Sequence, residues 1–280
     1  MKELFDSVCN SCSELVTKRY STSFSMAVNT LSPKIRTDIY NIYGFVRFAD
    51  EIVDTFHEYD KEELMTHFER DYYFATKHGI SLNPILNSFQ QTVKRYKIPD
   101  HMVQAFLKSM KADLHKTEYS TKEEYDEYIY GSADVVGLMC LKVFVNGDDA
   151  MFDELKDAAM RLGSAFQKVN FLRDLKDDYE VLNRSYFPNI DLGKLTQESK
   201  QIIIDEIEAD FDYAYKNGIL KLPVEAKFGV YMAYRYYRRL LKKLSNVPSE
   251  RIMDTRIRIS DPMKINLLAR SYVKYKLNII

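Results

Sequence analysis

The sequence predicts an all-α protein, and three observations support this fold class. Among 280 residues there are only nine glycines and seven prolines, the residues that most often interrupt helices. Apolar residues recur at spacings of three and four, as in an amphipathic helix, and no segment shows the sustained alternation of a half-buried strand. Hydrophobic residues make up 46% of the chain, enough for a large core. We therefore expect one helical domain over residues 1–280.

Ten helices are expected, separated by residues that begin or end helices well. Proline in LSPK suits the first turn of the second helix, and glycine in KHGIS suits the end of the third. Proline in KIPD and SNVPSE, and glycine in NGDD and NGILKLP, mark later breaks. No break is long enough to be a linker between domains. The expected helices cover residues 3–18, 33–57, 61–78, 82–96, 100–115, 121–146, 148–182, 197–217, 223–245 and 261–277.

The composition excludes several classes of function. The formal net charge is −1, so no basic excess favours nucleic acid, and local basic groups must meet any anionic ligand. Cys9 and Cys12 form a C-x-x-C, but no second Cys or His pair completes a zinc site. No signal peptide is recognisable, and the apolar run at 135–145 is too short to span a bilayer. We expect a cytoplasmic protein and leave open a peripheral contact with the inner face of the membrane.

The stretch RFADEIVDTF places acidic residues beside the apolar seam of the second expected helix. Apolar side chains recur at spacings of three and four over residues 39–56, which identifies the buried stripe. Asp50 and Asp54 lie one turn apart next to that stripe, in a row that begins with Tyr43 and Arg47. The acids therefore border the core instead of lying on the opposite face.

A second acid row lies on the helix expected at 148–182. Asn170, Asp174 and Asp178 follow one another at four-residue spacing, and Gln167 lies one turn earlier. Like charges at this spacing destabilise a helix by about 0.2–0.5 kcal/mol per pair, so a single row is most simply a solvated face. Two rows at core edges instead favour a cation between them.

The ligand chemistry of these rows favours a hard cation. Carboxylate and amide oxygens suit Mg²⁺, or Mn²⁺, and Mg²⁺ usually lets substrate phosphate complete its coordination shell. A di-iron centre needs Glu-x-x-His pairs, and none of the five histidines lies three residues after a glutamate. A catalytic zinc site lacks ligands as well. The sequence therefore predicts a magnesium site that binds a phosphate-bearing substrate.

Basic groups near the acid rows could cover the remaining phosphate oxygens. Arg47 and Arg173 lie on the acid-bearing helices, and either could instead neutralise its acidic neighbours. A metal–diphosphate site beside an apolar helical core fits an allylic isoprenyl diphosphate, because metal and arginine stabilise the departing charge. Gly131 and Gly137 inside the helix expected at 121–146 leave two interpretations open, either room for a bulky ligand or a close helix crossing.

Five blocks of sequence resemble the squalene/phytoene synthase family in order and spacing, over nearly the whole chain. The resemblance implies an all-α, isoprenoid-synthase-type helical bundle around a central apolar cavity. It also implies Mg²⁺-dependent head-to-head condensation of two prenyl diphosphates through a cyclopropylcarbinyl diphosphate. Proton loss then gives a phytoene-type triene, whereas reduction by NADPH gives squalene. The blocks are KRYSTSFSMA (18–27), IYGFVRFADEIVD (42–54), YIYGSADVVGLM (128–139), RLGSAFQKVNFLRDLKDDYE (161–180) and RSYFP (184–188).

The resemblance further implies the roles of individual residues. The implied metal ligands are Asp50, Asp54, Asn170, Asp174 and Asp178. The implied diphosphate-binding residues are Ser21, Ser23, Tyr43, Arg47, Gln167, Asn170, Arg173, Tyr237 and Arg256. The implied catalytic residues are Asp50, Asp54, Asp174, Asp178, Arg47 and, near the reacting carbons, Tyr130.

The chain departs from the family's pattern at two places. The family often has A-G-T-V-G where this chain has A-D-V-V-G at 133–137, so Asp134 replaces a small residue close to Tyr130. The first acid motif reads D-E-x-x-D instead of D-D-x-x-D, which keeps a carboxylate at Glu51.

We expect a phytoene synthase that joins two geranylgeranyl diphosphates in carotenoid precursor synthesis, without NADPH. A C30 synthase that makes dehydrosqualene or squalene from farnesyl diphosphate remains an alternative, because chain length depends on the depth of the pocket. A third alternative is a non-catalytic family member that acts as a binding or assembly protein. The retention of all four aspartates favours catalysis over that role. No obligate protein partner is expected.

Overall fold

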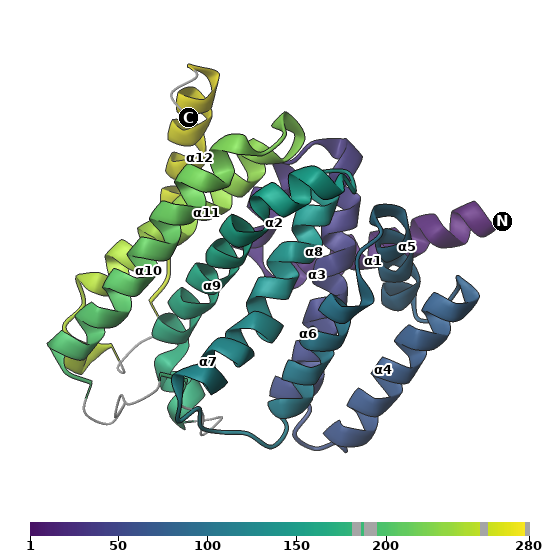
Figure 1. Cartoon of the computed structure of the whole chain (residues 1–280), viewed down its shortest axis with the longest axis horizontal. Coiled ribbons are helices and arrows are strands. Elements are labelled where there is room, and N and C mark those ends of the chain that lie inside the picture. Colours follow the sequence, from purple (N-terminus) through teal and green to yellow (C-terminus); the bar gives the residue numbers. More distant parts are fainter. Residues whose placement is uncertain (181–185, 188–194, 253–256, 278–280) are drawn as a thin grey trace.

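The computed structural model describes residues 1–180, 186–187, 195–252 and 257–277, with the backbone alone at 177–180. Every element in these ranges is helical, which confirms the all-α fold class (Figure 1). No described helix is both long and apolar enough to cross a bilayer. The α-helices are α1 (Lys2–Tyr20), α2 (Thr22–Asn29), α3 (Pro33–Asp54), α4 (Lys61–His78), α5 (Pro84–Tyr96), α6 (Asp100–Ala112), α7 (Lys122–Ile129), α8 (Val135–Phe144), α9 (Asp149–Glu180), α10 (Gln197–Asn217), α11 (Val224–Ser245) and α12 (Asp261–Lys276). Three short elements are the π-helical η1 (Tyr130–Asp134) and the 3₁₀-helical η3 (Ile219–Lys221) and η4 (Ser249–Arg251).

Most helix ends lie where the sequence has its start and stop residues. Ser32 and Pro33 begin α3, and Gly79 ends α4 in the left-handed conformation at φ 70°. Asn83 accepts hydrogen bonds from two backbone N–H groups in the first turn of α5, and Thr121 forms a capping box at the start of α7. These local signals explain why the boundaries could be predicted from the sequence.

Two features of the helices differ from the prediction. The sequence predicted no helix between 18 and 33, but α2 lies there because Ser21 adopts an extended conformation and caps it, accepting a hydrogen bond from the N–H of Phe24 at 3.2 Å. The prediction of a single helix at 121–146 was also wrong, because the wider turns of η1 separate α7 from α8.

The core is centred on α3, and aromatic side chains hold it in place. The fully buried ring of Phe45 stacks on Phe89 of α5 with 4.0 Å between centroids. The rings of Tyr72 on α4 and Phe106 on α6 each lie 5.6 Å from the same ring. Because three helices pack on Phe45, the orientation of α3 is fixed, and so is the edge that carries the acid row.

The glycines in and after η1 mark close helix crossings. A Cβ added to Gly131 would lie 2.8 Å from the carbonyl oxygen of Ala105 on α6. One added to Gly137 would lie 3.0 Å from the carbonyl oxygen of Ala159 on α9. Both glycines therefore allow two helix backbones to approach closely. Of the two interpretations that the sequence left open, the structure supports the close helix crossing. The central apolar cavity remains a prediction.

Candidate active site

The first acid row lies along one edge of α3. Phe45 and Ala49 on the adjacent face are fully buried, whereas the row itself is half-buried. Asp54 is the last residue of α3, at the negative end of the helix dipole, where a carboxylate is unfavourable unless a cation compensates it. The row consists of Tyr43, Arg47, Asp50 and Asp54.

Tyr43 lies in the most enclosed part of this row. Its ring stacks on Phe24 of α2 with 4.8 Å between centroids, and the Ser21 hydroxyl is a hydrogen-bond partner of its phenol. Burial raises the pKa of Tyr43 to about 12; Arg47 opposes this rise and Asp50 adds to it. The phenol therefore stays neutral at physiological pH and can donate a hydrogen bond to an anionic ligand.

Arg47 is already paired within the protein. Its guanidinium forms an ion pair with Glu51, one turn further along α3, and lies 4.6 Å from the ring centre of Tyr20. Its buried Nε has no hydrogen-bond partner among the described residues. Glu51, the acid retained in the D-E-x-x-D motif, thus neutralises Arg47. The Nε–H of the guanidinium remains available as a donor.

The second row lies near the C-terminal end of α9. Arg173 and Asp174 form an ion pair in which both side chains are largely buried. Although burial opposes the charge on Arg173, the Asp174 carboxylate raises its pKa above the ordinary value. The described side chains of this row are half-buried, like those of the α3 row, and comprise Gln167, Asn170, Arg173 and Asp174.

Tyr237 of α11 connects the two rows. Its phenol donates to Oδ1 of Asn170 at 3.3 Å, and its ring stacks on Phe166 with 4.1 Å between centroids. Burial raises the pKa of Tyr237, and Arg173 opposes the shift. Tyr237 is also near enough to Tyr43 to affect the pKa of that phenol. The two acid-bearing helices therefore border one polar cluster.

The two serines expected to bind diphosphate lie in different surroundings. Ser21 is beside Tyr43, at the edge of the polar cluster. Ser23 instead lines a small hollow together with Met232 of α11 and Lys264 of α12. The structure therefore associates Ser21, but not Ser23, with the cluster around Tyr43.

Of four further expected site residues, the structure describes the side chains of two. Tyr130 is half-buried in η1 and packs against the main core. Gln167 is half-buried on α9, between Phe166 and Asn170, which both contact Tyr237. The side chain of Asp178 and the whole of Arg256 fall outside the described residues, so their roles remain predictions.

The donor chemistry of the two rows fits a hard divalent cation. Asp50, Asp54, Asn170 and Asp174 offer only oxygen ligands, which Mg²⁺ and Mn²⁺ prefer. In the described part of the chain, no three acidic, His or Cys side chains converge as a ready metal site. Figure 1 shows α3 and α9 running in the same direction toward the lower end of the bundle. Both acid rows thus lie near the negative ends of helix dipoles, which attract cations.

Sequence reasoning missed several partners of the site residues. For Arg47, neutralisation by an acidic neighbour was one of two alternatives, and Glu51, at the four-residue spacing typical of an ion pair, proves to be that neighbour. The contact of Tyr20 with Arg47 and the stacking of Phe166 on Tyr237 had no signal in the sequence. Both depend on the packing of separate helices.

Asp134, the other departure from the family's pattern, lies in a buried polar network. Its carboxylate accepts a hydrogen bond from the hydroxyl of Ser164 on α9 at 2.7 Å. Burial raises the pKa of Asp134 to about 7, although Ser164 and Lys168 oppose the shift. Lys168 donates to Asp210 of α10 at 2.8 Å. The acid at this position therefore joins η1 to α9, near the pair of Lys168 and Asp210 that joins α9 to α10.

Asp134→Asn is expected to stabilise the protein increasingly as pH rises. The ordinary value of this carboxyl pKa is 3.8, and the folded value is about 7. Between these values the folded protein retains a proton that the unfolded chain releases, so stability falls with rising pH, by at most about 1.4 kcal/mol per pH unit. Urea unfolding followed by circular dichroism should show a widening difference between variant and parent. The matched control is Asp153→Asn, an exposed acid on α9. A difference in stability between variant and parent that stays constant with pH would contradict this expectation.

Comparison with known proteins identifies the class to which this fold and site belong. Residues 17–262 match the family model described as squalene/phytoene synthase. This match covers most of the 280 residues, and the chain belongs to the squalene/phytoene synthase family.

Individual relatives agree with this family. The chain is 26% identical over 266 residues to a 15-cis-phytoene synthase of Paracoccus sp., covering 89% of this chain and 86% of that one. It is 27% identical over 199 residues to a 4,4'-diapophytoene synthase of Staphylococcus haemolyticus, covering 70% and 66%. Among solved structures, a dehydrosqualene synthase with bound ligand superposes with a TM-score of 0.81 at 19% identity, covering 97% and 98%. Because the identity is only 19%, this structural likeness supports the fold alone.

Proposed function

We propose that this protein catalyses the Mg²⁺-dependent head-to-head condensation of two geranylgeranyl diphosphates to phytoene, a carotenoid precursor. The observation that carries the proposal is the position of α11, which packs against both acid-bearing helices, α3 and α9, and whose Tyr237 donates a hydrogen bond to Asn170 in the α9 row. Family membership and the similarity to phytoene synthases support the same reaction class. The cytoplasmic location expected from the sequence is part of this proposal.

On the α3 side, the chain offers a binding site for the first diphosphate. The neutral phenol of Tyr43 and the unpartnered Nε of Arg47 are hydrogen-bond donors that a phosphate oxygen can accept from. Asp50 and Asp54 lie one turn apart on the same edge and would hold the cation. A cation held by these carboxylates would supply the positive charge that neutralises a departing diphosphate.

On the α9 side, the second diphosphate would meet a matching set of groups. Arg173 and the phenol of Tyr237 are the donors, and Asn170 and Asp174 supply oxygen ligands for a cation. Arg173 pairs with Asp174, so binding of cation and diphosphate would separate charges that neutralise each other in this pair.

The reaction proceeds in two ionisations. The C1–O bond of one substrate breaks, and the double bond of the second attacks C1; loss of a proton then gives a cyclopropylcarbinyl diphosphate. Loss of the second diphosphate gives a cation that rearranges and releases a proton to form the central triene. Tyr130 would lie near these carbons, and aromatic rings can stabilise a carbocation through their negative faces. An apolar wall that excludes water would prevent water from reacting with the carbocation.

A C30 reaction on farnesyl diphosphate is the second candidate. It is favoured by the similarity to the staphylococcal 4,4'-diapophytoene synthase, which is about as high as the similarity to phytoene synthases. The proton-loss product, dehydrosqualene, would need no NADPH, whereas squalene would require it.

Incubation with labelled prenyl diphosphates tests the proposal. The purified chain is given farnesyl or geranylgeranyl diphosphate with Mg²⁺, in the presence and absence of NADPH, and the hydrocarbon products are separated by chromatography. We expect a C40 triene from geranylgeranyl diphosphate that does not depend on NADPH. A C30 product alone would establish the second candidate. No hydrocarbon product under any condition would refute catalysis and favour a binding role.

Tyr237→Phe is expected to weaken substrate binding more than it slows turnover. The variant removes the hydroxyl that bonds Asn170 at 3.3 Å but keeps the ring stacked on Phe166. The loss of one hydrogen bond to a charged ligand corresponds to about 1.5–3 kcal/mol, or roughly a ten- to hundredfold rise in KM. Steady-state kinetics with saturating Mg²⁺ measure this change. The control is Tyr213→Phe, an exposed tyrosine on α10, for which KM should stay at the parent value.

A further inference from the structure

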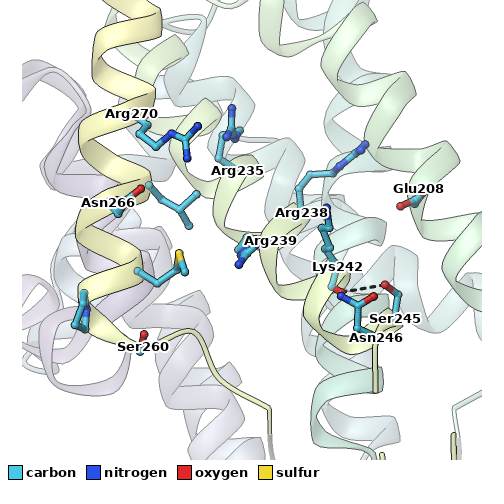
Figure 2. A pocket seen from close by; sticks show the side chains of 13 residues that line it. Glu208, Arg235, Arg238, Arg239, Lys242, Ser245, Asn246, Ser260, Asn266 and Arg270 are labelled. Atoms are coloured by element: carbon cyan, nitrogen blue, oxygen red, sulfur yellow. Dashed lines mark hydrogen bonds between the residues drawn. The ribbon is translucent and has the colours of Figure 1, made fainter. Parts of the chain in front are cut away.

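A hollow of about 940 Å³ lies between α11 and α12, apart from the acid rows (Figure 2). Residues of α11 and α12 line most of it, and Glu208 of α10 lies at its edge. Its volume is within the range of small-molecule sites, about 300–1,000 Å³. The hollow is open to solvent, since Arg239, Lys242 and Arg270 are exposed.

The lining of this hollow is strongly basic. One acid, Glu208, stands against five cationic side chains, although the whole chain has a formal net charge of −1. Figure 2 shows the cationic residues along both helices, with Arg270 on α12 across from those of α11. The five are Arg235, Arg238, Arg239, Lys242 and Arg270.

Few of these charges are neutralised inside the protein. Arg238 pairs with Asp212 of α10 at 2.7 Å, and Arg235 donates a hydrogen bond to the phenol oxygen of Tyr231 at 2.9 Å. Among the described residues, no ion pair or hydrogen bond involves the side chains of Arg239, Lys242 or Arg270. Arg239 and Lys242 are also one turn apart, where like charges repel. Three of the five cations therefore lack an anionic partner among the described residues.

The hollow is separate from the candidate active site. Successive residues of an α-helix are turned by about 100°, so Arg235, Arg239 and Lys242 share a face of α11 roughly opposite Tyr237. Tyr237 contacts α9 through Asn170, whereas the opposite face lies toward α12. A ligand in the hollow would thus lie behind α11 as seen from the acid rows.

We propose that this hollow is a second anion site, which takes a phosphate-bearing ligand. The planar guanidinium groups of Arg239 and Arg270 can each donate two parallel hydrogen bonds to a phosphate. Their positions on different helices let one ligand bridge α11 and α12. Such a phosphate can come from a soluble diphosphate or from the headgroup of an anionic lipid.

Titration of the full chain with inorganic diphosphate tests the site directly. The calorimetric titration is done in EDTA, so that cation-dependent binding at the acid rows does not contribute. We expect saturable binding to one site in the parent protein. Binding should weaken by about tenfold or more in R239Q/R270Q and recover in part in R239K/R270K, because lysine restores the charge without the fork of donors. The matched control is R70Q/K108Q, which removes two exposed positive charges on α4 and α6, far from α12 in Figure 1.

Co-sedimentation with lipid vesicles identifies the source of the phosphate. Vesicles of neutral phosphatidylcholine are compared with vesicles that also contain phosphatidylglycerol. Binding that requires both phosphatidylglycerol and the two arginines, and that diphosphate displaces, would assign the site to a lipid headgroup. Diphosphate binding that depends on the arginines, without selective binding to anionic vesicles, would assign it to a soluble ligand. The proposal is overturned when R239Q/R270Q equals the parent, or equals R70Q/K108Q, in both assays. Neither assay needs turnover, so this outcome is independent of the proposed reaction.

Discussion

Replacement of Asp54 by asparagine should reduce condensation by about a thousandfold or more while leaving the helical fold intact. Asparagine keeps the size of the side chain but removes the charge that would hold a cation at the end of α3. Without that cation the departing diphosphate is not neutralised, and a loss of about 4 kcal/mol of transition-state stabilisation corresponds to this factor. The fold should tolerate the change because the negative end of the helix dipole no longer faces a carboxylate.

Product formation from labelled substrate, with circular dichroism as a check on folding, measures the effect of Asp54→Asn. Asp126→Asn on α7, which alters an exposed acid paired with Lys122, is the matched control and should keep parental activity. Asp174→Asn should lose activity to a similar extent but also lose about 1–3 kcal/mol of stability, because it leaves the largely buried Arg173 without its partner. Parental turnover in Asp54→Asn would exclude a metal-binding role for that residue.

Removal of divalent cations is the second change with a large expected effect. Dialysis against EDTA should reduce product formation to background, and added Mg²⁺ should restore it, because the donors around Tyr43 and Tyr237 cannot neutralise two diphosphates alone. Mn²⁺ should substitute, since it prefers the same oxygen ligands. The measurement is the initial rate as a function of free cation concentration.

The EDTA experiment also needs a check that the chelator acts on catalysis and not on folding. Far-ultraviolet circular dichroism should be the same before and after dialysis, since the core around Phe45 is held by packed aromatic rings. Full turnover after exhaustive chelation would contradict the proposed metal dependence. Loss of helical signal on chelation would indicate a structural cation instead.

Much of the fold could be predicted because its signals are local. The N-cap of Ser32 before Pro33 and the left-handed Gly79 each act within a single turn. The sequence therefore identified the start of α3 and the end of α4. Helix α2 was missed because its eight residues are too few for the spacing of apolar side chains to indicate a helix. The π-helical turn at Tyr130–Asp134 was missed because it depends on how closely Gly131 approaches α6.

The candidate site could be predicted only in part. Helical spacing identified the rows that contain Asp50 and Asp174, because residues four apart share a helix face. The link through Tyr237 depends on the packing of α11 against α9, and no pattern within α11 indicates it. The ion pair of Arg173 with Asp174 was foreseen only as one of two alternatives, since adjacent residues on a helix usually diverge. The metal and diphosphate roles of these residues remain predictions.

The position of the acid rows near the C-terminal ends of α3 and α9 has a thermodynamic consequence for ligand binding. A diphosphate that approaches without a cation meets carboxylates and helix carbonyls, all of which repel it. Cation and diphosphate should therefore bind with positive cooperativity, and by linkage each must raise the affinity for the other by the same factor. The prenyl substrate would then occupy the protein at physiological concentration only as its magnesium complex, so the supply of the metal would govern how much of the enzyme is saturated.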